Sequence, residues 1–303
     1  MKRFALTLFC LLGIVTSLTA AEKLKALYLT GHTDRHHSWQ VLSQYQITLL
    51  EETGIFHVDK VVLPDTVTTE SVDFDRYDVV VLNVNQVRWS KKFKKKFARY
   101  IRKGGGLVVV HETDNAFPEW KEFNLMTALG GWGDRTEQAG PYCYWCDGAL
   151  YKDHITPGSA GKHGKRVPFV INVRNESHPI VSGLPRQWLH IEDELYGDLR
   201  GPAEHIDVIA TAFSETKSGG TGKEEPVLFT VTYGKGRIFR CVLAHTKKGN
   251  DKALRNVGYQ IVFQRGTQWA ATGRVTLGTG GFILSADKPT LRTIDEIKGA
   301  ARP

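Results

Sequence analysis

Beyond its N-terminus, the sequence lacks any apolar run long enough to cross a membrane, so it contains no candidate transmembrane helix. The apolar stretch at residues 4–18 is itself shorter than the roughly 18 residues that a spanning helix needs. It follows a short basic start, Met1-Lys2-Arg3, and precedes small residues that suit cleavage. This pattern predicts a signal peptide over residues 1–21, and therefore export of the mature chain to the periplasm or the extracellular space.

Cysteine is also scarce, with four residues in a chain of 303. Cys143 and Cys146 form the one C-x-x-C pair, and no thioredoxin-like strand and helix surround it. A local disulfide or two free thiols is therefore favoured over redox catalysis. Because there is no second C-x-x-C pair, the sequence also argues against a cysteine-based zinc site.

Several catalytic and nucleotide-binding motifs are missing. There is no G-x-S-x-G motif and no cysteine at the strand end that His111 occupies, so the nucleophile elbow of hydrolases and amidotransferases has no nucleophile. The glycines at 104–106 precede a strand instead of following one, which excludes a dinucleotide-binding fingerprint. The stretch GGTGKE at 219–224 lacks the spacing of a phosphate-binding loop.

Acidic residues are fewer than basic ones, 32 against 40, which gives a net charge of +8. Removal of Lys2 and Arg3 with the signal peptide leaves about +6. Much of this excess lies in residues 90–103, where large apolar residues recur at helical spacing and lysines take the opposite face. No aromatic platform interleaves the lysines, so we predict a solvated helix face and no nucleic-acid partner.

What the sequence does contain is an alternation of buried strands and helices. Strands are predicted over residues 24–31, 56–63, 77–85, 106–112, 167–173 and 206–213, with a hairpin over 226–245 that turns at 233–236. Helices are predicted over 39–53, 90–103 and 251–271. Continuous runs of Val, Leu and Ile are typical of strands covered on both faces. We therefore predict an α/β fold with a flavodoxin-like, doubly wound, mostly parallel sheet.

Two segments depart from this alternation. Residues from about 115 to 165 are rich in glycine and aromatic residues and are too long for a plain connection, which indicates an inserted lid. The Gly-rich tail at 277–303 is predicted to be peripheral to a single domain over residues 22–276.

Polar side chains gather where the predicted strands end. His111 and Glu112 follow one strand, Asn85 ends another, and His37 lies in a histidine-rich stretch after the first. Ligands of open parallel sheets bind at the carboxyl ends of the strands. We therefore expect these side chains to converge on one edge of the sheet.

Ten stretches follow one another in an order that resembles the ThuA-like (trehalose utilisation) family. They include "GGGLVVVHETDNAFPEWKEFN", "LGGWGDR", "SHPIVSGLP" and "DELYGDLRGPAEHIDVIATAF", and together they cover nearly the whole mature chain. The resemblance implies a fold like that of the class I glutamine amidotransferases without their cysteine, and so no glutamine amidotransferase activity. It also implies a role in the catabolism of trehalose and related disaccharides, including oxidised glycosides.

The resemblance further implies which polar residues form the site. The residues that match the family's motifs are His37, Trp39, Asn85, Arg88, His111, Asn115, His163, Asp193, Glu194 and His245. Two positions depart from the family pattern: Glu112 stands where a small residue is commoner, and Ala-His-Thr replaces the usual Gly-His-Asp around His245.

We expect three kinds of role among these residues. Because imidazole titrates near neutral pH and a carboxylate can exchange protons with it, the predicted catalytic residues are His111, Glu112 and His245. Aromatic faces, amides and charged groups suit a sugar, so the predicted substrate-binding residues are Trp39, Asn85, Arg88, Asn115, His163, Asp193 and Glu194. A candidate site for a divalent metal, with zinc favoured, consists of His37, His111 and His245.

Two hypotheses about function remain open at this point. In the first, the protein is an enzyme, a hydrolase, lyase or isomerase, that cleaves a disaccharide or keto-glycoside by acid/base or metal-assisted chemistry. A carbonyl at C3 of such a sugar acidifies the C2 proton, which a histidine can remove. In the second, it is a noncatalytic carbohydrate-binding or scaffold protein. The partner in both is a small carbohydrate, and the sequence is compatible with a homo-oligomer.

Overall fold

The computed structural model describes residues 22–31, 35–67 and 72–300. The predicted signal peptide at residues 1–21 lies outside the described residues. Within the part of the chain that is described, no helix is both long and apolar enough to span a membrane.

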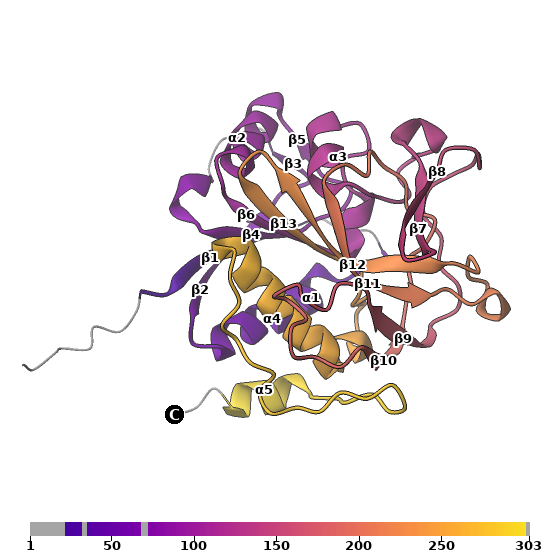
Figure 1. Cartoon of the computed structure of the whole chain (residues 1–303). Coiled ribbons are helices and arrows are strands. Elements are labelled where there is room, and N and C mark those ends of the chain that lie inside the picture. The colour runs from indigo at the N-terminus through magenta and orange to yellow at the C-terminus, as the bar shows by residue number, and fades with distance from the viewer. Residues whose placement is uncertain (1–21, 32–34, 68–71, 301–303) are drawn as a thin grey trace, which may run out of the picture.

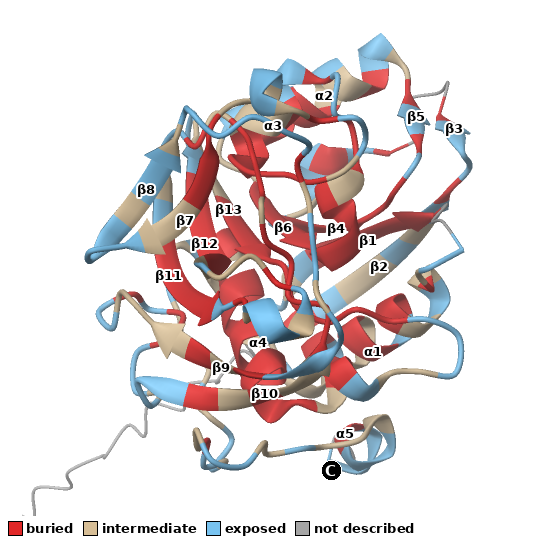
Figure 2. Cartoon of the chain, turned by 90° about the vertical axis from the view of Figure 1, so that its right-hand side faces the viewer, coloured by how far each residue is buried: buried red, intermediate tan, exposed pale blue. Residues whose placement is uncertain are grey.

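Five parallel strands form one half of the main sheet (Figure 1). In spatial order they are β2 (Phe56–Leu63), β1 (Leu24–Gly31), β4 (Val79–Asn83), β6 (Gly106–Val110) and β13 (Gly236–Cys241). Numbered along the chain among themselves, they follow the order 2-1-3-4-5 of a flavodoxin-like sheet. Every residue of β4 and β6 is buried, because helices cover both faces (Figure 2). The predicted doubly wound α/β fold is therefore confirmed.

The sheet continues past β13 as an antiparallel half. The predicted hairpin joins β12 (Glu224–Tyr233) to β13, and β11 (Ile206–Phe213), β9 (Val167–Val173) and β10 (Gln187–Asp193) complete the sheet out to its edge. β10 is not among the predicted strands, because this partly buried edge strand carries no continuous apolar run. A separate two-stranded sheet pairs β3 (Thr66–Val67) with β5 (Arg88–Trp89).

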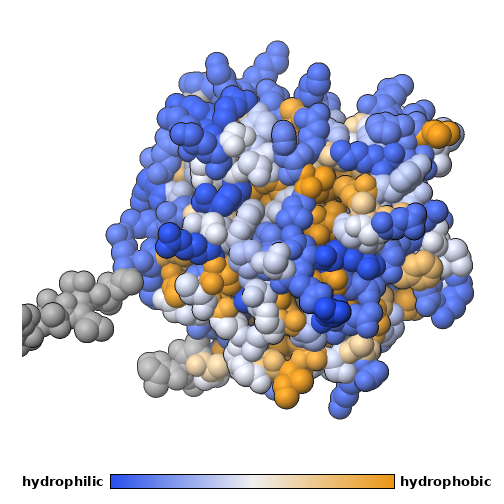
Figure 3. Space-filling view, in the orientation of Figure 1, coloured by the Kyte–Doolittle hydropathy of each residue, from blue (hydrophilic) through white to orange (hydrophobic). Residues whose placement is uncertain are grey.

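Helices cover the two faces of the sheet. α1 (Trp39–Glu52) and α4 (Val257–Thr272) lie on one face, whereas α2 (Lys91–Arg102) and α3 (Lys121–Thr127) lie on the other (Figure 1). The Ser90 hydroxyl caps α2 by accepting a hydrogen bond from the Phe93 amide at 3.2 Å. The aromatic residues of α2 are buried and most of its lysines are exposed, as predicted, and the surface there is hydrophilic (Figure 3).

The helix predicted over residues 251–271 is in fact two elements. Lys252–Arg255 form a short 3-10 helix, and α4 begins only at Val257. Between them, Asn256 adopts an extended conformation, and its side chain accepts a hydrogen bond from the Tyr259 amide at 3.1 Å. The break therefore arises because Asn256 caps α4 instead of continuing a helix.

The segment at 115–165 contains α3 and a hairpin that joins the main sheet. Its strands are β7 (Tyr142–Cys146) and β8 (Ala149–Asp153), and β7 pairs with β12. Cys143 is buried and Cys146 is exposed, and both are free thiols, which is one of the two alternatives that the sequence left open.

The C-terminal tail runs along the outside of the domain and ends in α5 (Ile294–Ala300), which packs beside α1. Ile297 of α5 is fully buried. The Arg292 carbonyl accepts a hydrogen bond from the Tyr45 hydroxyl at 2.7 Å, and the Arg292 guanidinium pairs with Glu52 at 2.6 Å.

Candidate functional site

Four side chains that could bind a cation meet at the carboxyl ends of four strands. His37 follows β1, His111 follows β6, Glu194 follows β10 and His245 follows β13. One potential ligand atom from each lies within 4.8 Å of the other three. We call these four residues the histidine cluster. They come from positions 37, 111, 194 and 245, so only the fold brings them together.

Glu194 lies among the histidines of the cluster. Its Oε2 is 3.7 Å from His111 Nε2, and its Oε1 is 3.4 Å from His245 Nε2. The ring centroid of His37 lies 5.6 Å from that of His111 and 5.1 Å from that of His245. His111, Glu194 and His245 are buried, so water screens their charges weakly.

The tautomer of neutral His111 is fixed by the backbone. Its Nδ1 donates to the Val242 carbonyl at 2.6 Å, so its Nε2 carries the lone pair and faces Glu194. Nε2 is buried and has no hydrogen-bond partner among the described residues. Burial lowers the pKa of His111, but the nearby carboxylates of Glu194 and Asp193 outweigh it and raise the pKa above the usual value.

The pKa values of the other two buried members of the cluster are shifted in the direction that favours cation binding. Burial, followed by the nearby charge of His111, lowers the pKa of His245 to about 3, so its imidazole is neutral at physiological pH. Burial raises the pKa of Glu194, but the contacts with His111, His245 and Arg166 prevail and hold it below the usual range. A neutral imidazole and an ionised carboxylate are the forms that ligate metals.

Arg166 belongs to the site, although the sequence analysis did not single it out. Its Nη2 and Nε donate to Glu194 Oε1 at 2.5 and 3.1 Å. Nη2 also lies 3.4 Å from His245 Nε2. Arg166 comes three residues after His163 in the stretch HGKR, so the only signal in the sequence was its place in a motif that matches the family.

A second layer of contacts orients His37. Its Nδ1 lies 3.8 Å from Glu112 Oε2, and its Nε2 lies 3.3 Å from the Tyr196 hydroxyl. The Tyr196 ring lies against His111 with its centroid 4.0 Å away. Glu112, which the sequence predicted to be catalytic, therefore adjoins the cluster through His37, and Tyr196 is a further contact that the sequence analysis missed.

Comparisons with known proteins identify the family of this chain. Residues 25–270 match the profile of the ThuA family, described as "Trehalose utilisation". The chain belongs to the ThuA family. A solved ThuA-like protein from Parabacteroides merdae is 40% identical, with a TM-score of 0.85 over 89% of this chain and 98% of that one. Another, from Bacteroides uniformis, is 16% identical with a TM-score of 0.54 over 87% and 97%, a likeness of fold alone. Comparison with curated proteins gives no match. Family membership supports a role related to carbohydrate utilisation.

In this ThuA-family chain, Asp193 does not face the cluster, unlike its neighbour Glu194. It is buried, and its carboxylate accepts hydrogen bonds from the amides of Glu194, Ala244 and His245 at 2.8, 2.6 and 3.0 Å, and contacts His190 Nε2 at 2.9 Å. Ala244 has a φ of +78°, a conformation that is costly for a residue with a Cβ. Asp193 therefore holds the loop that presents His245, which is a positioning role.

The remaining predicted residues lie in three places. His163 is at the edge of the cluster, with Nε2 3.9 Å from Glu194 Oε1. Asn85, Arg88 and Asn115 line one cavity of about 710 Å³, which we call the polar cavity. Trp39 is not part of either group, since its ring packs under the Lys60 ammonium on β2 at 5.1 Å.

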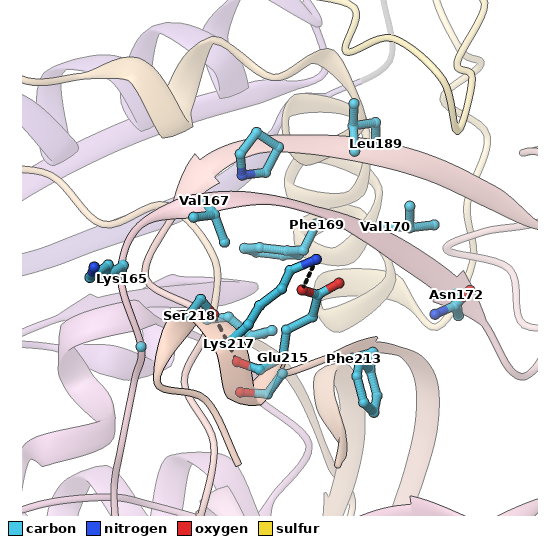
Figure 4. A pocket seen from close by; sticks show the side chains of 14 residues that line it. Lys165, Val167, Phe169, Val170, Asn172, Leu189, Phe213, Glu215, Lys217 and Ser218 are labelled. Carbon is cyan, nitrogen blue, oxygen red and sulfur yellow. Dashed lines mark hydrogen bonds and ion pairs between the residues drawn. The ribbon is translucent and has the colours of Figure 1, made fainter. Parts of the chain in front are cut away.

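A second cavity, of about 560 Å³, lies between the start of β9 and the loop after β11 (Figure 4). Phe169, Leu189 and Phe213 give it an apolar lining, and the Lys217 ammonium at its rim pairs with Glu215 at 2.6 Å. None of the site residues that the sequence predicted lines this apolar cavity.

Proposed function

We propose that this protein is a cation-dependent enzyme that cleaves the glycosidic bond of an oxidised disaccharide. The observation that carries the proposal is the histidine cluster, in which four ligand atoms from four strand ends lie within 4.8 Å of one another. The family's association with trehalose utilisation supports the choice of a disaccharide. The signal-peptide pattern at residues 1–21 supports a site of action outside the cytoplasm.

The donor set fits a divalent cation such as zinc. Three imidazoles and one carboxylate form a usual zinc ligand set, and His111 Nε2 is a buried lone pair without a hydrogen-bond donor among the described residues. The hydrogen bond from His111 Nδ1 to a backbone carbonyl is the outer contact that metal-binding histidines usually make. When bound, the cation supplies positive charge for an oxygen that becomes negative during the reaction.

His163 is the residue best placed to move a proton. Its Nδ1 donates to the Gly164 carbonyl at 2.8 Å, so in the neutral ring Nε2 holds the lone pair at the edge of the cluster. Its side chain is 38% exposed, against 1% for His111 and 2% for His245, so a substrate can reach it.

The reaction is an elimination from a sugar that carries a ketone at C3. His163 takes the proton from C2, and the electron pair of that C–H bond moves into the C3 carbonyl as an enolate. The enolate then reforms the carbonyl as a C1–C2 double bond forms and the C1–O bond breaks. The leaving oxygen takes a proton, which yields one free sugar and one unsaturated keto-sugar. No nucleophilic cysteine is needed, which agrees with its absence at His111.

The test compares four proteins: the wild type, His111→Ala, His163→Ala and His57→Ala. His57 is an exposed histidine of β2 and serves as the matched control. We expect near-stoichiometric zinc or a similar ion in the wild type, and at least about tenfold weaker binding in His111→Ala. His163→Ala should keep the metal and lose about 10²- to 10⁴-fold in turnover of a 3-keto-disaccharide.

Elemental analysis and a turnover assay distinguish the outcomes. A metal-free wild type, or full turnover by both His111→Ala and His163→Ala, would contradict the proposal. Binding of the sugar without turnover would instead support the noncatalytic carbohydrate-binding hypothesis.

A further inference from the structure

The polar cavity has the size and chemistry of a sugar subsite. Its volume of about 710 Å³ falls in the range of small-ligand sites. The amides of Asn85 and Asn115, the guanidinium of Arg88 and the carboxylates of Glu119 and Asp134 line it. Such groups can donate to and accept from the hydroxyls of a sugar. The cavity beside β9 also has polar residues, but Phe169, Leu189 and Phe213 give it a more apolar lining.

Two side chains of the polar cavity favour a sugar as its ligand. Asn115 Oδ1 is buried and has no hydrogen-bond donor among the described residues, so a ligand hydroxyl would satisfy it. Trp132 is only partly buried, and it offers an aromatic face of the kind on which the C–H groups of a pyranose ring pack.

Four residues that line this cavity adopt a costly backbone conformation. Gln86, Phe117, Trp132 and Asp134 all have φ between 46° and 61°, although none is glycine. Such residues persist only where the surrounding structure fixes them, and they gather at ligand sites.

Arg135 holds much of this backbone in place. It is buried, and its guanidinium donates to the carbonyls of Ala116 at 2.7 Å and Gly131 at 2.9 Å, and to the Asn124 side chain at 3.2 Å. One cation thus ties together the loop after β6 and the loop that carries Trp132.

The polar cavity adjoins the histidine cluster through two aromatic rings. Trp132 lines the cavity, and its ring centroid lies 4.4 Å from that of Tyr196. Tyr196 in turn lies against His111, and its hydroxyl contacts His37. Asn115 is the last residue of the short 3-10 helix His111–Asn115, so this one element contributes to both places.

We propose that the polar cavity binds the sugar residue that leaves, while the oxidised residue of the same disaccharide lies beside His163 at the edge of the histidine cluster. The location of the cleaved bond in this inference rests on the proposed function. The substrate class is then a hexopyranosyl hexopyranoside, with Asn115 and Trp132 as binding residues for the second ring.

The experiment measures binding, so it does not depend on turnover. Isothermal titration calorimetry with α,α-trehalose and with glucose is applied to the wild type, Asn115→Ala, Trp132→Ala and Trp145→Ala. Trp145 is also partly buried but lies outside the polar cavity, on β7, which makes Trp145→Ala the matched control. Circular dichroism checks that each variant is folded.

We expect the wild type to bind trehalose more tightly than glucose. Asn115→Ala should weaken trehalose binding by about tenfold, the loss expected for one buried hydrogen bond. Trp132→Ala should weaken it by about as much, because the packing of the sugar ring on the indole is lost, and Trp145→Ala should leave it unchanged. His111→Ala should reduce the affinity for trehalose toward that for glucose while glucose binding persists.

Several results would overturn the inference. These are no detectable binding of either sugar by the wild type, unchanged binding in Asn115→Ala and Trp132→Ala, and equal affinities of the wild type for trehalose and glucose. A metal-free wild type that still binds trehalose through Asn115 would contradict the proposed reaction alone, so the two failures are distinguishable.

Discussion

At the scale of single residues, the direction in which each buried carboxylate points decides what it contacts. Glu194 and Asp193 are adjacent, yet one faces three histidines and the other satisfies backbone amides. A third buried carboxylate, Glu225, lies far from both in the sequence. It accepts hydrogen bonds from the hydroxyls of Tyr142 and Thr221 at Oε1, and its Oε2 has no partner among the described residues.

Glu225 predicts a pH dependence of stability. Burial raises its pKa to about 7, although the hydrogen bonds from Thr221 and Tyr142 oppose the shift. Its pKa is thus higher in the folded than in the unfolded chain, so its contribution to stability is present below pH 4.5 and is lost as the pH rises through 7. The loss is on the order of 3 kcal/mol, from 1.36 kcal/mol per pKa unit.

Glu225→Gln should remove this loss, because the amide does not ionise. Urea denaturation at pH 5 and pH 8 measures the free energy of unfolding at both ends of the range. Glu215→Gln, at a more exposed carboxylate, is the control and should behave as the wild type does. An equally steep pH dependence in Glu225→Gln would show that the group does not titrate as stated.

At the scale of the elements, close packing between α4 and β13 fixes where His245 emerges. β13 carries Phe239, whose ring lies directly against Gly266 of α4. A Cβ built on Gly266 would lie 2.1 Å from the Phe239 ring, and Phe239 is fully buried. Glycine is needed at position 266 because the helix approaches the strand so closely. The loop that carries His245 follows β13, so the position of this loop depends on the same packing.

Gly266→Ala should therefore destabilise the protein by about 1–3 kcal/mol, the usual cost of overpacking a core. Gly299→Ala is the matched control, because it also lies in a helix but a Cβ there has no neighbour within 4 Å. Alanine favours helix over glycine, so that control should be neutral or slightly stabilising. Chemical denaturation of both variants checks this, and equal stabilities would contradict the packing argument.

At the scale of the whole molecule, the C-terminal tail covers part of one face of the domain, although it lies outside residues 25–270, which match the family. Leu284 and Ile297 of the tail are buried, and Arg292 pairs with Glu52 of α1. The Thr290 carbonyl also accepts a hydrogen bond from the first amide of α4 at 2.9 Å. The tail thus contacts the two helices of the same face.

Deletion of residues 278–303 should lower the free energy of unfolding by on the order of 3–6 kcal/mol, since Leu284 and Ile297 are buried and each such side chain contributes about 1.5–3 kcal/mol. Differential scanning calorimetry should show a lower Tm. Ile283→Ala is the control, because Ile283 belongs to the same tail but is 84% exposed, and it should leave the Tm unchanged. A truncated protein as stable as the wild type would mean that the tail contributes nothing to the domain.

The sequence by itself determined the strands of the parallel half and the position of polar residues at their ends. Runs such as Gly106–Val110 are apolar throughout because both faces are covered, and this pattern is visible without coordinates. His37, His111 and His245 could therefore be predicted as a candidate site from the rule that parallel strands present ligands at one edge.

Only the tertiary structure decided which side chains meet there. Glu194 faces the histidines and Asp193 faces the backbone, because successive residues at the end of a strand point in opposite directions. Arg166 lies in the loop just before β9, and it reaches Glu194 only because β9 and β10 pair in the folded sheet. Arg135 donates to carbonyls of the loop after β6 and of the loop that carries Trp132, which only the fold brings together. Contacts between segments distant in the chain depend on how the layers pack, and this is why the pattern of residues could place the site but not assemble it.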